Sequence, residues 1–220
     1  MSVRDGAIAI LGGTGKEGQG LALRFASRGR QVILGSRDAE KGRRIADELN
    51  ARLSSNLVSG TANVEAAHEG EVVLSTLPYA GHIETAAEVR DALEGKLVVT
   101  ATIRWPPSLD GHPSAAEELA RALEGSARVA AAFQTVSAGA LARLDGEPED
   151  VLVFADSPDV RKETLALVDS TGLRGVDAGT LQKTRVAEAL TGLLLGINKT
   201  YGVKKAGIRV TGLPPRRTEP

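Results

Sequence analysis

The sequence contains no cysteine among its 220 residues, so disulfide bonds, a thiolate nucleophile and cysteine-ligated zinc are all excluded. Histidine is scarce as well, with only His68, His82 and His112. Their spacing does not fit a set of metal ligands, and none stands beside a serine or aspartate as in a catalytic triad. The formal net charge is −1, which gives no basis for binding nucleic acid or an anionic membrane surface.

Long hydrophobic runs are also missing. The most apolar stretch, 190–197, is far shorter than the roughly 20 residues that a membrane-spanning helix needs. The N-terminus lacks the basic and then apolar pattern of a secretory signal. We therefore expect a soluble, cytoplasmic protein with no membrane segment and no nucleic-acid partner.

Apolar strand-like runs alternate with helix-like segments along the whole chain. Such alternation is typical of βαβ units and predicts the α/β class, with a doubly wound (Rossmann), mostly parallel sheet and a C-terminal helical extension. The final helix has no strand after it, so we expect a Rossmann domain at 1–180 and a C-terminal helix and tail at 181–220. Strands are expected at 7–11, 32–34, 57–59, 71–76, 96–100, 128–133, 151–155 and 173–176, and helices at 16–28, 39–53, 63–68, 82–93, 114–123, 157–170 and 181–201.

A glycine-rich turn, Gly13-x-Gly15-x-x-Gly18, follows the first apolar run. It has the spacing of a dinucleotide-binding loop, and the strand, helix and second strand expected around it are the context that such a loop requires. Gly13 permits the tight turn, Gly15 lets the backbone approach a pyrophosphate, and Gly18 allows close packing of helix and strand. The free N–H groups and positive dipole end of the helix would then face the phosphates.

The second expected strand ends in Ser36-Arg37 rather than in an acidic residue. NAD-preferring sites have an aspartate or glutamate here, which hydrogen-bonds the ribose 2′-hydroxyl. A 2′-phosphate carries negative charge and strong acceptors, so Ser36 can donate a hydrogen bond, Arg37 can bind two oxygens and Lys41 can add a positive charge. These residues favour NADP over NAD.

Two loops follow later strands at the carboxyl edge of the expected sheet, where nicotinamide ligands lie. The first contains Thr76, Leu77 and Pro78. The second, at 100–107, contains Trp105, the only tryptophan. Because aromatic side chains usually bury their area, Trp105 is explained equally well as a hydrophobic plug and as a residue that contacts a ligand.

No side chain is placed for acid–base work, and we predict neither a catalytic residue nor a metal site. His82 opens a helix just after Pro78 and could approach a substrate, but a solvent-facing helix start is the simpler interpretation. The carboxylates Glu147, Glu149 and Asp150 flank a turn and are expected to be solvated. Hydride transfer between two cofactors needs mainly proximity and alignment, so the lack of acid–base groups is compatible with it.

The chain resembles the F420-dependent NADP oxidoreductases, enzymes that pass hydride between NADP(H) and the deazaflavin coenzyme F420. The resemblance extends over most of the chain and includes both motifs described above. Its later parts are the more specific ones, since a general Rossmann protein has no need of them. The segments that carry it are 11–18, 35–37 with Lys41, 75–78, 129–138, 177–181 and 185–191.

The resemblance implies two cofactors, NADP(H) and coenzyme F420, with direct hydride transfer between them. The C-terminal segment 181–220 would complete the acceptor pocket and form the contact of a homodimer. The implied sites are Thr14, Gly15, Lys16 and Glu17 for the pyrophosphate, Ser36, Arg37 and Lys41 for the 2′-phosphate, Pro78, Ile103 and Ala138 for the nicotinamide, and the chain near Ala206 for the deazaflavin.

Two loops depart from the family pattern. Gln134-Thr135-Val136-Ser137 stands where archaeal members have His-Thr-Ile-Pro, and the segment 102–107 replaces a more apolar stretch. Both border the second ligand, so two alternatives stay open. One is NADPH-dependent reduction of another acceptor, such as a flavin, a ferric chelate or a small carbonyl; a carbonyl would need a proton donor, for which Tyr79, His82 and Tyr201 are candidates. The other is a non-catalytic, NADP-sensing protein.

Overall fold

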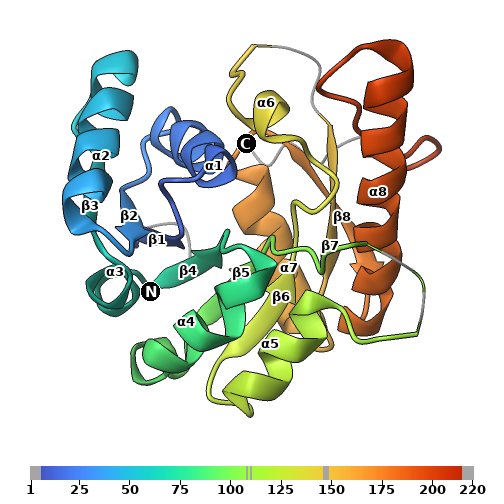
Figure 1. Cartoon of the computed structure of the whole chain (residues 1–220), viewed down its shortest axis with the longest axis horizontal. Coiled ribbons are helices and arrows are strands. Elements are labelled where there is room, and N and C mark those ends of the chain that lie inside the picture. Colours follow the sequence, from blue (N-terminus) through green and yellow to red (C-terminus); the bar gives the residue numbers. More distant parts are fainter. Residues whose placement is uncertain (1–5, 108, 110, 146–148, 215–220) are drawn as a thin grey trace.

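The computed structural model describes residues 6–107, 109, 111–145 and 149–214. Its centre is an eight-stranded sheet in the order β3-β2-β1-β4-β5-β6-β7-β8, with helices on both faces (Figure 1). The expected doubly wound, mostly parallel sheet is therefore confirmed. The strands are β1 Ile8–Leu11, β2 Val32–Ser36, β3 Val58–Ala62, β4 Val72–Ser75, β5 Leu97–Thr100, β6 Arg128–Ala131, β7 Asp150–Phe154 and β8 Arg174–Gly179.

The strands β3, β2, β1, β4, β5 and β6 are parallel. β7 is antiparallel to β6, with Ala131 opposite Phe154, and β8 is parallel to β7. Every residue of β1, β2, β4 and β5 is buried. Parallel strands covered on both faces read as continuous apolar runs, which is why the sequence indicated them so clearly.

In the described part of the chain, two large apolar cores lie on the two faces of the sheet, in addition to a smaller cluster that includes Phe154, Leu181 and Ala187. One contains side chains of α1, α2 and α7, and the other contains side chains of α3, α4 and α5. Successive residues of β1 contribute alternately, with Ile8 and Ile10 in the first core and Ala9 and Leu11 in the second. The helices are α1 Lys16–Ala26, α2 Ala39–Leu53, α3 Asn63–Glu69, α4 His82–Glu88, α5 Ala115–Leu123, α6 Ala138–Leu141, α7 Pro158–Asp169 and α8 Thr184–Tyr201, with 3-10 turns η1 Tyr79–Gly81, η2 Arg90–Leu93 and η3 Leu181–Lys183.

Most helices begin where the sequence predicts. α5 has the capping box expected from Ser114 and Glu117, and Gly29, after α1, has the left-handed φ of 81° that favours glycine. The helix expected at 82–93 is wrong in its second half, since α4 ends at Glu88 and the chain continues as η2. The sequence also missed α6, because a helix of four residues is too short to show periodicity.

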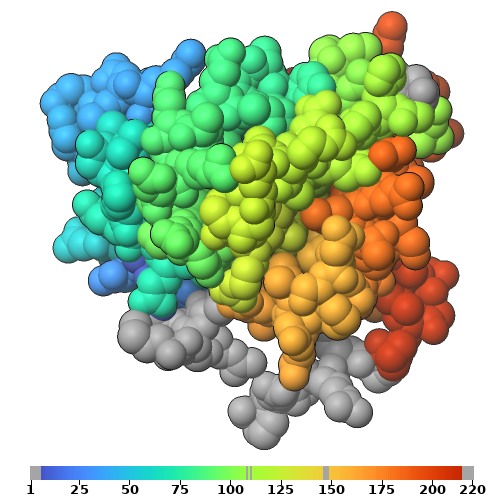
Figure 2. Space-filling model, turned by 90° about the horizontal axis from the view of Figure 1, so that it is seen from below, coloured from blue at the N-terminus to red at the C-terminus, as the bar shows by residue number. Residues whose placement is uncertain are grey.

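α8 lies beside β7 and β8, at the opposite end of the sheet from α2 (Figure 1). Seen from below, the colours run from blue on one side to red on the other, so order along the chain broadly follows order across the sheet (Figure 2). The division at residue 180 stays a prediction, and residues 215–220 of the expected tail lie outside the described part. Within the described residues, every helix falls short of the length or apolar character that crossing a bilayer demands.

Candidate functional site

The turn between β1 and α1 is built almost entirely from backbone. Gly13 N–H donates to the carbonyl oxygens of Ile10 (3.1 Å) and Gly35 (2.9 Å), which ties the turn to β2. A Cβ on Gly18 would lie 2.6 Å from Gly13 Cα, so only glycine lets α1 approach the turn this closely. A Cβ on Gly15 would meet only the carbonyl oxygen of Gly12, at 3.4 Å. Gly15 therefore leaves open space rather than a packing contact.

The first turn of α1 has no side-chain cap. Gly15 is its N-cap residue and provides no acceptor, although the first N–H groups of any helix lack an intrahelical partner. The helices α2, α5 and α7 are capped by the side chains of Asp38, Ser114 and Ser157. α3, α4 and α8 also lack a side-chain cap, but only α1 among these four follows the glycine turn, so its uncapped N–H groups match the predicted anion site.

Glu17, the second residue of α1, is partly buried. Burial raises the pKa of its carboxyl to about 8, so the group is mostly protonated at neutral pH. A neutral carboxyl can donate a hydrogen bond to a phosphate oxygen, whereas a carboxylate can only accept and would repel the phosphate. Its protonation state therefore suits the phosphate contact that the resemblance implies for Glu17.

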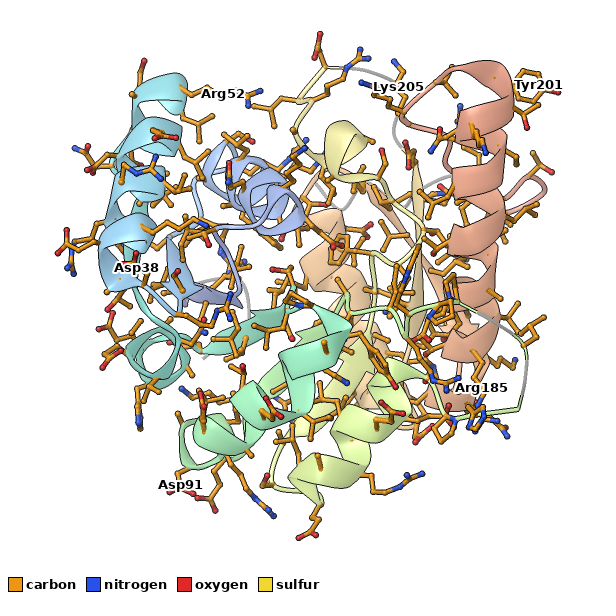
Figure 3. All side chains as sticks on the ribbon, viewed as in Figure 1. Asp38, Arg52, Asp91, Arg185, Tyr201 and Lys205 are labelled. Carbon is orange, nitrogen blue, oxygen red and sulfur yellow. The ribbon has the colours of Figure 1, made fainter. Side chains whose placement is uncertain are left out.

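The end of β2 carries the predicted 2′-phosphate residues. Ser36 is buried, and its Oγ accepts a hydrogen bond from Asp38 N–H at 3.2 Å, which leaves the hydroxyl proton available to donate. Asp38 caps α2 by accepting from Lys41 N–H at 3.2 Å (Figure 3). Arg37 and Lys41 are exposed, and neither has an ion-pair partner within the part of the chain that the structure describes. Their charges are thus free to bind an anion.

Asn63, the first residue of α3, braces both motifs and was missed in the sequence. Its Oδ1 accepts from Gly12 N–H at 3.2 Å, and a Cβ on Gly35 would lie 2.7 Å from the same oxygen. The buried Asn63 side chain therefore joins the glycine turn to the end of β2. It follows β3, at the end of a polar strand, and nothing in its spacing distinguishes it from an ordinary helix start.

The loops after β4 and β5 meet at the carboxyl edge of the sheet. Thr76 is hydrogen-bonded to the end of β1: both its N–H and its Oγ donate to the carbonyl oxygen of Leu11 at 3.0 Å. Leu77 is buried and its carbonyl accepts from Thr102 Oγ at 2.9 Å, whereas Pro78 is exposed and Ile103 partly buried. The structure thus brings together the loops of Pro78 and Ile103, which the sequence predicts at the nicotinamide.

The segment between β6 and α6 turns back over this edge. Phe133 is fully buried with φ of 75°, a strained conformation for a bulky residue. Gln134 is also buried. Its side-chain Nε2 donates to the Thr100 carbonyl oxygen at 2.9 Å, and its main-chain carbonyl oxygen accepts from Thr191 Oγ at 2.8 Å. Ala138 then begins α6. These bonds fix the path of the chain between β6 and Ala138.

α6 is held against α1 by Arg24. The guanidinium donates to the carbonyl oxygens of Ala140 (2.9 Å), Leu141 (3.0 Å) and Arg143 (2.7 Å). The segment of Ala206 also approaches α6, since a Cβ on Gly139 would lie 3.8 Å from the Lys204 carbonyl oxygen. A cavity of about 390 Å³ lies between α1, α6 and this segment. Its lining residues are Arg24, Ala140, Arg143, Asp145, Glu149, Leu173, Lys205, Gly207, Ile208 and Arg209.

His82 does not face solvent, so that interpretation is wrong. It is 2% exposed, its ring stacks on Tyr79 at a centroid distance of 5.2 Å, and its Nε2 lies 3.5 Å from Glu118 Oε2. Burial lowers the pKa of His82, although Glu118 acts in the opposite direction. The sequence could not show this because Glu118 comes from α5, far along the chain.

The expectation that the carboxylates after β6 are solvated also needs correction, and one of the two interpretations of Trp105 is excluded. Asp150 is not solvated: it is 2% exposed, pairs with Arg174 (Nε to Oδ1, 2.7 Å) and accepts from Val210 N–H at 2.6 Å. Burial alone would raise the pKa of Asp150, but these hydrogen bonds hold it below its usual value. Glu149 is partly buried and Glu147 lies outside the described residues. Trp105 is 62% exposed, so it is not a hydrophobic plug.

The sequence is similar to known proteins over nearly its full length. The sequence is 40% identical to the F420-dependent NADP reductase of Methanothermobacter marburgensis, covering 94% of this chain and 99% of that protein. It is 36% identical to the F420-dependent NADP reductase of Methanocaldococcus jannaschii, covering 94% and 98%. A family model described as NADP oxidoreductase coenzyme F420-dependent matches residues 7–104.

A solved structure from Arthrobacter sp. FB24 has the same fold. It superposes with a TM-score of 0.74 at 24% identity, and the match covers 90% of this chain and 95% of that one. At this identity the likeness concerns the fold alone.

Proposed function

Because the chain belongs to the F420-dependent NADP oxidoreductase family, we propose that it transfers hydride between NADP(H) and coenzyme F420. The observation that carries this proposal is the likeness to the methanogen reductases over 94% of the chain, which includes the segments beyond the nucleotide-binding half. The uncapped glycine turn and the unpaired Arg37 and Lys41 support it independently, since they suit the phosphates of NADP.

On the NADP side, the backbone at Gly13 to Gly18 would hold the pyrophosphate. N–H groups at the start of α1 donate to it, and the helix dipole favours its charge. Ser36 would donate its hydroxyl proton to the 2′-phosphate, while Arg37 and Lys41 neutralise that group from the exposed side. An NAD molecule lacks this phosphate and would leave both cations without a partner.

On the acceptor side, Thr76, Leu77, Pro78, Ile103 and Ala138 would border the nicotinamide, and the segment of Ala206 would contact the deazaflavin. The hydrogen bonds between the β4 and β5 loops, and those that hold α6, support this arrangement by making the rim rigid. NADPH supplies the hydride and F420 accepts it. The task of the protein residues is to align the two rings and exclude water, so a dedicated catalytic side chain is not required.

We also propose that the protein is a homodimer and acts in the cytoplasm. Val186, Leu193 and Tyr201 are 60%, 61% and 75% exposed on α8. Their spacing, with the partly buried Leu190 and Ile197 between them, makes one apolar stripe along the helix. A second copy of the chain could cover this stripe. The absence of cysteine means that no disulfide depends on an oxidising compartment.

The decisive test mixes the purified protein with NADPH and F420 and follows the absorbance of the deazaflavin. Loss of F420 absorbance that matches NADPH oxidation supports the proposal. Unchanged absorbance at high protein concentration contradicts it. NADPH oxidation with a flavin, a ferric chelate or a carbonyl but not with F420 would identify another acceptor, and tight NADPH binding without any turnover would identify a sensing protein.

A further inference from the structure

One buried carboxylate fastens both ends of the β5–α5 loop, residues 101–114. Glu188, in the second turn of α8, accepts a hydrogen bond from Arg104 N–H through Oε2 (3.2 Å) and another from Ala115 N–H through Oε1 (2.9 Å). The Glu188 side chain is 3% exposed, so water competes little for these amides. Each oxygen of the carboxylate therefore secures one end of the loop.

The chemistry of this contact specifies a carboxylate. Two main-chain N–H donors point at two oxygens, and a glutamine would present an acceptor to one and an NH₂ group to the other. Burial raises the pKa of Glu188 to about 7, and the neighbouring carboxylates Glu118 and Glu117 raise it as well, while the two main-chain N–H groups lower it. An apolar side chain would join α8 to α5 without this desolvation cost, so packing alone does not explain the residue.

The loop end that Glu188 holds is also bonded to the site. Arg104 Nε donates to Tyr79 Oη at 3.3 Å, and Thr102 Oγ donates to the Leu77 carbonyl at 2.9 Å. Ile103 lies between these two contacts. The main chain at 102–104 is thus fixed on one side by the β4 loop and on the other by Glu188. Arg185, one turn earlier on α8, lies at the same end of the helix near α5 (Figure 3).

We propose that Glu188 is a positioning residue for hydride transfer: by holding the N–H groups of Arg104 and Ala115, it fixes Ile103 against the nicotinamide side of the site. This role rests on the proposed function. In this role Glu188 would touch neither coenzyme and would act through the main chain of Arg104. Because small misplacements of reacting groups cost large factors in rate, loss of the contact should affect transfer more than binding.

The test compares Glu188→Gln with a matched control, Glu84→Gln, which removes an exposed carboxylate on α4. At pH 8 and saturating coenzymes, Glu188→Gln is expected to slow single-turnover hydride transfer roughly 10- to 100-fold. Its Kd for NADPH, measured without acceptor, should stay within about twofold of the wild type, because the phosphate contacts that dominate binding are untouched. Glu84→Gln should match the wild type in both.

Trp105 provides a readout that needs no acceptor. It is the only tryptophan and follows Arg104 directly, so its fluorescence anisotropy reports the order of the loop. Glu188→Gln should lower this anisotropy, and Glu84→Gln should not. In the wild type, anisotropy should also fall as the pH decreases from 8 to 6, since a protonated Glu188 keeps only one good acceptor for the two amides.

The pH dependence of the rate gives a second signature. The ratio of wild-type to Glu188→Gln rates should shrink toward one as the pH falls through about 7, because protonation makes the wild type resemble the variant. Taking the ratio cancels the titration of the coenzymes themselves. The charged or titratable groups linked to Glu188, directly or through one another, are Tyr79, His82, Arg104, Glu117, Glu118 and Arg185.

Equal transfer rates for Glu188→Gln and wild type at pH 8 would overturn the positioning role. A loss of NADPH affinity as large as the loss of rate would overturn it too, since that would mean collapse of the site. A wild type that leaves F420 unchanged contradicts the proposed function instead, and Trp105 anisotropy then still decides whether Glu188 orders the loop. If Glu188→Gln does not fold, Glu188→Asp takes its place, since the shorter side chain cannot reach both N–H groups; an unchanged Trp105 anisotropy and an unchanged transfer rate in that variant overturn the assignment.

Discussion

The coenzyme preference that we propose depends on a few side chains at the end of β2. Ser36 is oriented by the hydrogen bond from Asp38 N–H, while Arg37 and Lys41 extend into solvent from the start of α2. The Asp38 carboxylate, which could have discriminated against a phosphate, is occupied with capping α2. For the binding of a phosphate, the unpaired charges of Arg37 and Lys41 are therefore more important than the Asp38 carboxylate, which is already hydrogen-bonded.

We expect Arg37→Ala to weaken NADPH binding by about 2–3 kcal/mol, because a charge-assisted contact to the 2′-phosphate is lost. NADH binding should change little, since NADH has no such phosphate. Fluorescence titration with both coenzymes measures the difference. Arg44→Ala is the matched control, because Arg44 is an exposed arginine on the neighbouring helix α2 and pairs with Glu48. Equal losses for NADPH and NADH would show that Arg37 does not contact the phosphate.

Glu17 predicts a distinct pH dependence of coenzyme binding. Burial raises the pKa of its carboxyl to about 8, so the group is neutral below that pH and charged above it. Affinity for NADPH should therefore fall as the pH rises through about 8, and Glu17→Gln should remove this fall while keeping the affinity seen at neutral pH. The folded pKa also exceeds the unfolded value, so ionisation lowers stability between about pH 4.5 and 8. Titration calorimetry at several pH values measures the NADPH affinity of both proteins. If the affinity of Glu17→Gln falls with pH in the same way as that of the wild type, this interpretation is contradicted.

At the scale of elements, the glycines of the β1–α1 turn serve different purposes. Gly18 is required by packing, because a Cβ at this position would clash with the main chain of Gly13. Gly15 faces open space, and its backbone is in the extended region with φ of −73°, so the conformation itself tolerates alanine. Substitution of each should therefore give a different defect.

We expect Gly18→Ala to destabilise the protein by about 1–3 kcal/mol, as overpacking does. Gly15→Ala should leave the thermal midpoint nearly unchanged but reduce NADPH affinity at least roughly tenfold, because the methyl group occupies the space of the pyrophosphate. Thermal unfolding and NADPH titration of both variants measure this. If Gly15→Ala binds NADPH normally, the coenzyme does not approach the backbone there.

For the whole molecule, the exposed face of α8 is the feature that a single chain leaves unexplained. Its stripe at Val186, Leu193 and Tyr201 is apolar and exposed, at the end of the sheet opposite α2. A second copy that covered this stripe would remove it from water, and the dimer would gain about 25 cal/mol of free energy for each Å² of apolar area buried.

Leu193→Glu should therefore convert the proposed dimer to a monomer, because it would bury a charge in the contact. Leu195→Glu is the matched control. Leu195 is 47% exposed on the same helix, but it lies two residues after Leu193 and therefore on the opposite side of the helix. Sedimentation velocity measures the mass of each variant. A dimer that survives Leu193→Glu, or a wild type that is already monomeric, would contradict the proposed contact.

Local patterns in the sequence were sufficient to predict the sheet and the glycine turn between β1 and α1. Buried parallel strands produce continuous apolar runs, and a phosphate-binding turn requires glycines at set spacings, so both are encoded in neighbouring residues. The capping box of α5 and the left-handed Gly29 belong to the same class. The residue roles assigned to the site remain predictions.

Only the tertiary structure decided which polar groups lie inside. His82 meets Glu118, Asp150 meets Arg174, and Glu188 meets both ends of the β5–α5 loop, each across a long separation in sequence. The free energy of a buried charge depends on the partners that the fold brings to it, and a sequence pattern does not include them. The sequence therefore determined the sheet and the glycine turn, whereas the fold determined which polar groups hold the loops at the carboxyl edge of the sheet in place.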